Sequence, residues 1–154
     1  RYTANRGDIE AAENMLVGSL FAGIAFSWAR LGDVHAMSHP VSAFFNVPHG
    51  VANAILLPTI VEYNALADHG KYFNIYNYIA PLPAALEDFT PDMLVDAIVE
   101  LNDSLGIPGG LEEVGVTKDK FDVMADDAMK SGNIAVNPRS TTKKDILDLY
   151  ERAF

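Results

Sequence analysis

The sequence contains no cysteine, so it can form neither a disulfide framework nor a thiolate metal site. Basic residues are also scarce, because 11 Lys and Arg against 21 Asp and Glu give a formal net charge of −10. Nucleic acids and anionic membrane surfaces bind through basic patches, so neither is an expected partner of this chain. The lack of disulfides is compatible with a reducing compartment, and we expect a cytoplasmic location.

Long hydrophobic runs are missing as well. The longest one, from Leu16 to Trp28, contains Gly and Ser and is shorter than the ~20 apolar residues that a bilayer span requires. Hydrophobic residues nevertheless make up 49% of the chain, which predicts a globular protein of one domain. No initiating Met and no hydrophobic signal region are present, so we expect the chain to be cut from something longer.

Helical periodicity dominates the sequence, and no strand-like alternation of useful length occurs, so the predicted fold is all-α. The pattern over residues 8–30 predicts a helix that is apolar on more than one face and therefore central. A second helix, over 35–45, is expected to be interrupted near Pro40, and a third, from Pro48 to about Asn64, to be kinked at Pro58. Further helices are predicted over residues 68–80, 91–105, 117–131 and 142–153.

Three of the four histidines, His35, His39 and His49, lie close together in the sequence. His35 and His39 are four residues apart, so on a helix they share a face and reach toward one point. His49 follows a proline-containing turn near an expected helix start, where the helix dipole favours the neutral imidazole that metal binding requires. Single histidines are more often surface or hydrogen-bonded residues, so spacing by itself leaves both a metal site and ordinary histidines open.

The histidines lie within two longer motifs, GDVHAMSHP at residues 32–40 and FNVPHGVANAILLP at residues 45–58. These motifs resemble the C-terminal helical half of the iron-containing alcohol dehydrogenases. Residues 22–27, 103–108 and 137–139 fit the same pattern, so the resemblance covers most of the chain. It implies an all-α multi-helix bundle with a dehydroquinate-synthase-like fold.

The resemblance also implies roles for individual residues. It makes His35 and His49 ligands of a divalent metal, Fe²⁺ or Zn²⁺, and it places His39 beside the metal and the nicotinamide as a catalytic residue that handles substrate or proton. Phe26 matches a residue that packs near the nicotinamide. The implied activity is NAD(P)-dependent hydride transfer between a small alcohol and an aldehyde, with the metal acting as a Lewis acid.

Part of such an enzyme is missing from the sequence. A tetrahedral catalytic site takes about three protein ligands, whereas the family's Asp-x-x-x-His ligand pattern does not precede His35 here. No strand–glycine-rich turn–helix unit for a dinucleotide occurs either. We therefore interpret residues 1–154 as a C-terminal helical metal- and substrate-binding domain, with the N-terminal dinucleotide-binding domain absent and the isolated chain inactive.

A free-standing helical metal-binding or oligomerisation module without catalysis is the alternative. Loss of an upstream half would expose apolar surface, so we expect the missing half of the same protein, or a homo-oligomer, as partner. Arg30 stands where the family pattern favours Gly or Ala, which leaves two readings: a contact to a charged substrate group, or a solvated or ion-paired arginine. The turn Asn137-Pro138-Arg139 is expected to use its guanidinium to fix a loop.

Overall fold

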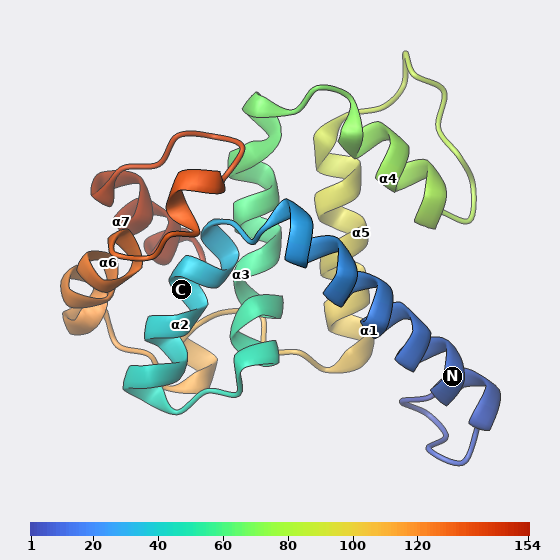
Figure 1. The fold of residues 1–154 in the computed structure, drawn as a ribbon, viewed down its shortest axis with the longest axis horizontal. Coiled ribbons are helices and arrows are strands. Elements are labelled where there is room, and N and C mark those ends of the chain that lie inside the picture. Colours follow the sequence, from blue (N-terminus) through green and yellow to red (C-terminus); the bar gives the residue numbers. More distant parts are fainter. The chain divides into compact units, whose positions relative to one another are not determined.

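The computed structural model describes residues 1–154 and contains helices only (Figure 1). The prediction of an all-α fold is therefore confirmed. The chain divides into two compact units, residues Arg1–Leu31 and Gly32–Phe154.

The first unit consists of helix α1, Ile9–Ala29, and the turns before it. The helix matches the predicted range 8–30 and begins at Asp8, whose carboxylate accepts a hydrogen bond from the Ala11 N–H at 3.0 Å. Its apolar side chains point in all directions, and only Ala11 is buried, whereas Trp28 is 87% exposed. A helix that is apolar on all sides needs partners that a single-helix unit does not supply, so the expectation that this helix is central stays a prediction.

Helix α1 also corrects an expectation about length. It is 21 residues long with a mean hydropathy of 1.3 over its most apolar stretch, so by length and composition it is able to cross a membrane. The expectation rested on the apolar run from Leu16 to Trp28 alone. The helix is longer than this run because it begins at Ile9 and includes Glu10 and Glu13 in its first turns. A core helix that is covered on all sides passes the same test, so these two properties assign no membrane location.

The second unit is a bundle built around helix α3, His49–Asn64. Helix α2, Asp33–Phe45, packs against α3 on one side, and α5, Pro91–Leu105, packs against it on the other. Helix α6, Phe121–Met129, covers α2 and contacts α7, Lys143–Arg152, while α4, Lys71–Ile79, lies on α5 (Figure 1). Four short 3₁₀ helices occupy the connections: Ala65–Ala67, Glu112–Val114, Lys118–Lys120 and Ile134–Val136.

The core of this bundle joins residues that are far apart in the sequence. Met37 of α2, Leu56 of α3 and Tyr150 of α7 are all fully buried. The Tyr150 hydroxyl donates a hydrogen bond to the Met37 carbonyl at 2.7 Å, and its ring stacks on Phe121 with centroids 5.5 Å apart. Full burial of one such side chain stabilises the fold by roughly 1.5–3 kcal/mol, so this cluster holds α2, α6 and α7 together.

Two prolines lie inside helices of the second unit. Helix α2 continues through Pro40, so the predicted interruption is wrong, and α3 continues through Pro58. A proline in a helix interior costs about 3 kcal/mol, because it removes one backbone hydrogen bond and crowds the preceding turn. Pro40 lies between the buried residues Met37 and Val41, whose packing offsets this cost.

Helix ends follow local capping rules. A capping box starts α7, with the Asp145 carboxylate accepting from the Thr142 N–H at 2.8 Å and the Thr142 hydroxyl accepting from the Asp145 N–H at 3.3 Å. Helix α4 begins later than predicted because Asp68 caps it from outside, accepting the Lys71 N–H at 3.0 Å. The start of the predicted helix 117–131 is a 3₁₀ turn, so α6 proper is shorter.

The start of α2 is held by a buried carboxylate. Asp33 is fully buried, and one of its carboxylate oxygens accepts a hydrogen bond from the Thr141 hydroxyl at 2.6 Å. The Asp33 backbone N–H donates to the Asn137 side-chain oxygen at 3.2 Å, and a Cβ on Gly32 would come within 2.8 Å of that oxygen. Burial raises the pKa of Asp33 to about 6, against the opposing effect of the Thr141 hydrogen bond.

The turn that contains these partners is fixed in the predicted way. The Arg139 guanidinium donates to the Tyr63 carbonyl at 2.8 Å and lies 3.8 Å from the centroid of the Tyr63 ring. The expectation that this arginine fixes a loop is confirmed. The loop in turn brings Asn137 and Thr141 to the start of α2.

Replacing Thr141 by Val tests the anchoring of Asp33. At neutral pH the substitution keeps the side-chain shape but removes the hydroxyl donor to a buried carboxylate, and we expect the free energy of unfolding to fall by about 1.5–3 kcal/mol. Urea denaturation measures this loss. Thr90→Val is the control, since the Thr90 side chain makes no capping hydrogen bond; equal losses in both variants would contradict the assignment.

Arg30, which ends α1, adopts a backbone conformation that suits glycine. Its φ of 68° and ψ of −175° lie in a region that residues with a Cβ rarely occupy. The side chain is exposed and forms none of the ion pairs in the structure. The structure shows no ion pair of this arginine, and both the contact to a charged substrate group and the solvated arginine stay predictions.

Arg30→Gly is expected to raise the free energy of unfolding by about 1 kcal/mol, the relief of strain less the greater flexibility of glycine in the unfolded chain. Thermal and urea unfolding measure the change. Arg30→Ala removes the guanidinium but keeps the Cβ, so it is expected to bring no such gain. Equal stabilisation by both substitutions would show that the side chain, not the backbone, is responsible.

Candidate metal centre

The three clustered histidines come from two packed helices. His35 lies in the first turn of α2, His39 follows one turn later, and His49 is the first residue of α3. Asn46, with a φ of 54°, ends α2 in a left-handed conformation, and Pro48 precedes the first residue of α3. This short turn leads the chain directly from the helix that carries two of the histidines into the helix that carries the third.

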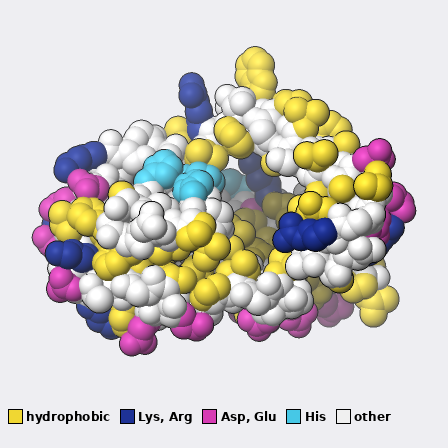
Figure 2. Space-filling view, turned by 90° about the horizontal axis from the view of Figure 1, so that it is seen from below, with side chains coloured by type: hydrophobic (Ala, Val, Ile, Leu, Met, Phe, Trp, Pro, Cys, Tyr) yellow, Lys and Arg dark blue, Asp and Glu magenta, His cyan; other side chains and the backbone are white.

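The structure brings the three imidazoles together. The ring centroids of His35 and His49 are 5.2 Å apart, those of His39 and His49 are 5.2 Å apart, and those of His35 and His39 are 6.2 Å apart. The His39 and His49 rings are stacked at an interplanar angle of 24°. Histidine side chains group on one face of the surface in Figure 2. The residues singled out by sequence spacing thus form one cluster.

A fourth residue, Asn53, distinguishes two of these histidines from the third. Its side-chain nitrogen lies 3.3 Å from Nε2 of His35 and 3.1 Å from Nε2 of His49. Two ring nitrogens from different helices therefore face a single point. Sequence reasoning missed Asn53, although it follows His49 by four residues on α3 and so shares its helix face.

The surroundings of His35 and His39 favour the neutral form of these two imidazoles. Burial, followed by the neighbouring His49 and His39, lowers the pKa of His35. Burial and the proximity of His49 lower the pKa of His39 in the same direction. A histidine binds a metal through the lone pair of its neutral ring, so the half-buried His35 is held in the form that metal binding requires.

The donor set fits part of a divalent-metal shell. The Nε2 atoms of His35 and His49 converge, and the buried Oδ1 of Asn53 beside them has no hydrogen-bond partner. No group of three or more His, Cys, Asp or Glu side chains is placed to hold a metal ion by itself. The chain thus offers two imidazole nitrogens that face one point, fewer than the three ligands that a catalytic site usually takes.

His39 occupies a different position from the other two. It is exposed, and it lines a cavity of about 210 Å³ between α2 and α6 together with Asp127 and Ser131. No contact between His39 and the Asn53 nitrogen is found, in contrast to His35 and His49. Its ring therefore stacks beside the convergent pair and opens toward this cavity.

Phe26, the residue expected near the nicotinamide, belongs to the first compact unit, on α1, and is 48% exposed. The histidines belong to the second unit. The role of Phe26 in cofactor binding stays a prediction.

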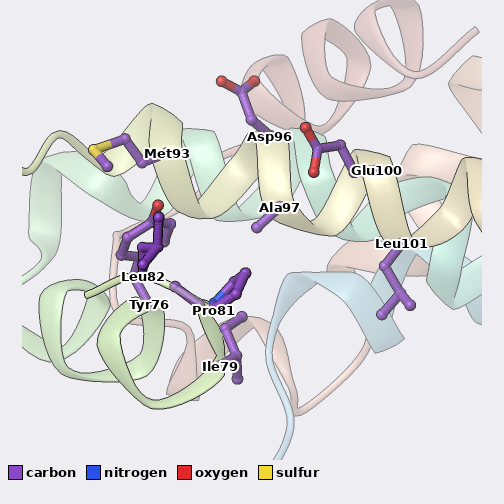
Figure 3. Close-up of a pocket in the computed structure, with 10 residues that line it drawn as sticks. Tyr76, Ile79, Pro81, Leu82, Met93, Asp96, Ala97, Glu100 and Leu101 are labelled. Atoms are coloured by element: carbon purple, nitrogen blue, oxygen red, sulfur yellow. The ribbon is translucent and has the colours of Figure 1, made fainter. Parts of the chain in front are cut away.

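Another cavity of the second unit lies between α4 and α5 and has a volume of about 740 Å³ (Figure 3). Its lining is mainly apolar, with the carboxylates of Asp96 and Glu100 on the α5 side. None of the histidines lines it. Chemistry that needs convergent metal ligands is therefore confined to the cluster on α2 and α3.

Comparisons with known proteins identify the family of this chain. Residues 1–154 match the sequence profile of the Fe-containing alcohol dehydrogenase family, C-terminal. The 1,3-propanediol dehydrogenase of Citrobacter freundii is 38% identical over 148 residues, which are 96% of this chain and 38% of that protein. The lactaldehyde reductase of Escherichia coli strain K12 is 40% identical over 149 residues, which are 96% of this chain and 39% of that protein.

Solved structures show the same fold. A crystal structure of a 1,3-propanediol oxidoreductase superposes with a TM-score of 0.89 at 36% identity, covering 96% of this chain and 39% of that one. An alcohol dehydrogenase from Oenococcus oeni superposes with a TM-score of 0.90 at 34% identity, covering 98% and 40%. The chain thus spans about two fifths of the length of these relatives. It belongs to the Fe-containing alcohol dehydrogenase family, of which it represents the C-terminal helical part.

Proposed function

We propose that this chain is the metal- and substrate-binding part of an NAD(P)-dependent alcohol dehydrogenase that interconverts a small alcohol and the corresponding aldehyde. The observation that carries the proposal is the convergence of Nε2 of His35 and Nε2 of His49 on one point. Two relatives that align with 96% of this chain are a 1,3-propanediol dehydrogenase and a lactaldehyde reductase. Both names refer to small alcohols or aldehydes as substrates.

In this proposal His35 and His49 are the two metal ligands that the chain contributes. The family name favours Fe²⁺, and imidazole ligands suit Zn²⁺ as well. The metal, when bound, supplies a Lewis acid that polarises the substrate oxygen. Burial lowers the pKa of His35 and so favours its neutral ring, and the two helices hold both ring nitrogens on a common point before any ligand arrives.

His39 is the proposed proton-handling residue. It stacks on His49, so it lies beside the ligand pair without sharing the convergent point. Its exposed ring lines the cavity between α2 and α6, which gives it a route for exchanging a proton with solvent. Phe26, an exposed aromatic ring on α1, is the proposed apolar contact of the nicotinamide.

The remaining parts of the active site are assigned to the rest of the protein. Two imidazoles leave at least one ligand position to be filled, and the helical chain has no dinucleotide-binding strand–turn–helix unit. The apolar side chains exposed on α1 offer a surface for that missing part or for a second copy in a homo-oligomer. We propose that the complete protein works in the cytoplasm and that the isolated chain does not turn over alcohols.

Alanine replacement of either proposed ligand tests the metal centre. In the full-length protein that carries this chain, His35→Ala and His49→Ala are each expected to weaken binding of Co²⁺ or Zn²⁺ by more than about 100-fold, the upper loss seen for outer-shell partners. Competition with a chromophoric chelator measures the affinity. His69→Ala is the control, because His69 is exposed and lies outside the cluster; undiminished binding in both ligand variants would refute the proposed centre.

His39→Ala separates proton handling from metal binding. The variant is expected to keep the metal affinity of the unsubstituted protein and to lose about 10²–10⁴-fold in kcat, the usual contribution of a general acid or base. Steady-state kinetics and metal titration are measured on the same preparation. A loss of metal in this variant would make His39 a ligand instead, and an unchanged kcat would remove it from the reaction.

The second candidate, a helical metal-binding or oligomerisation module without catalysis, is favoured by the exposed apolar side chains of α1. The same measurements discriminate between the two functions. Tight metal binding with no alcohol-dependent reduction of NAD or NADP by the full-length protein would support the module.

A further inference from the structure

The carboxamide of Asn53 occupies the point on which the two proposed metal ligands converge. Asn53 lies one helical turn after His49 on α3, and its Nδ2 reaches Nε2 of His49 at 3.1 Å and Nε2 of His35 on α2 at 3.3 Å. No other side chain bridges the two histidines. Asn53 therefore links the two halves of the proposed centre.

The bridge determines which nitrogen of each imidazole carries the proton. A carboxamide nitrogen carries two hydrogens and no lone pair, so each Nε2 that it faces has to be the acceptor. In a neutral ring the proton then lies on Nδ1. Asn53 thereby selects, in both His35 and His49, the tautomer that has a free Nε2 lone pair, which is the form that binds a metal through Nε2.

The other end of the same carboxamide is unsatisfied. Oδ1 of Asn53 is buried and accepts no hydrogen bond. An unpaired buried acceptor costs about 1–3 kcal/mol, so the observed orientation of the amide is stabilised only by its two contacts to the histidines. A cation bound to the two Nε2 atoms would take their lone pairs. The amide N–H groups of Asn53 could then no longer donate hydrogen bonds to these atoms, so both contacts would be lost.

We propose that Asn53 is a positioning residue of the metal centre. When no metal is bound, its amide nitrogen holds the Nε2 atoms of His35 and His49 in position. When a metal is bound, its amide oxygen turns toward the metal. Rotation about the last side-chain bond exchanges the positions of Nδ2 and Oδ1. This gives the unsatisfied oxygen a partner, either the cation itself or a water that the cation holds. The oxygen is a hard, neutral donor of the kind that divalent Fe²⁺ and Co²⁺ accept.

The inference rests on the proposed metal-binding function, and it adds a residue that neither the spacing of the histidines nor their implied roles contains. The amide is therefore expected to act both in the metal-free protein and in the metal-bound protein. Loss of the amide affects the orientation of the rings in the metal-free protein and the affinity of the metal-bound one.

Two substitutions separate the functions of the nitrogen and the oxygen. Asn53→Leu has a similar volume and neither donor nor acceptor, so in the full-length protein it is expected to weaken Co²⁺ binding by about 10–100-fold, as loss of an outer-shell partner does. Asn53→Asp keeps an oxygen and adds a charge, so it is expected to bind Co²⁺ at least as tightly as the unsubstituted protein. Chelator competition gives the affinities, and the visible absorption bands of Co²⁺ report the coordination.

The histidine tautomers of the metal-free protein distinguish a positioning role of Asn53 from a general loss of structure. Long-range ¹H–¹⁵N spectra of the metal-free protein are expected to show His35 and His49 protonated on Nδ1, and Asn53→Leu is expected to lose this preference. Asn102→Leu is the matched control, since Asn102 is a half-buried asparagine that donates to the Ala54 carbonyl at 2.8 Å and touches no histidine. This control is expected to leave the affinity, the Co²⁺ bands and both tautomers unchanged.

The outcomes are distinguishable from failure of the metal centre itself. If His35→Ala abolishes Co²⁺ binding while Asn53→Leu leaves the affinity, absorption bands and tautomers unchanged, the role of Asn53 is overturned and the centre stands. Equal losses in Asn53→Leu and Asn102→Leu would also overturn it, because they would show a structural effect. If His35→Ala and His49→Ala bind Co²⁺ normally, the proposed centre is wrong and the inference falls with it.

Discussion

The packing of α2 against α3 is the constraint on which the candidate centre depends. Met37 and Val41 on α2 and Ala52 and Leu56 on α3 are completely buried, so the helices have little freedom to slide or rotate. His35 and His49 project from these same helices. The interior of a protein is close-packed, and a shift of the two helices would open a cavity and separate the ring nitrogens together. Core packing thereby sets the geometry of a site on the surface of the bundle.

Polar groups near the start of α2 complement this packing. At the start of the helix, buried Asp33 is tied to Thr141 and, through its backbone, to Asn137. Near the site, Asn53 joins the helix to α3 through the two imidazoles. Each arrangement leaves one buried oxygen without a partner. Burial raises the pKa of Asp33. At Asn53 the free oxygen lies beside two ring nitrogens that face one point, where a cation would satisfy it.

The C-terminal helical part of this family has two features that point to a missing partner. It spans about two fifths of its relatives, and its first helix exposes apolar side chains in every direction. Two histidines do not complete a catalytic metal shell. Both facts have the same explanation under the proposed function, because a site shared between two parts of a protein leaves unfilled ligand positions and uncovered apolar surface on each.

Local features of this protein were determined by the sequence by itself: the helical periods, the capping box at Thr142, the proline start and glycine end of α5, and the family motif around the histidines. These depend on neighbours within a few residues, and so a linear pattern reveals them. The course of α2 through Pro40, the burial of Asp33 and the bridging by Asn53 were decided only by the tertiary structure. Each depends on residues from a different helix or a distant loop, and the free energy of those contacts cannot be predicted from neighbouring residues in the sequence.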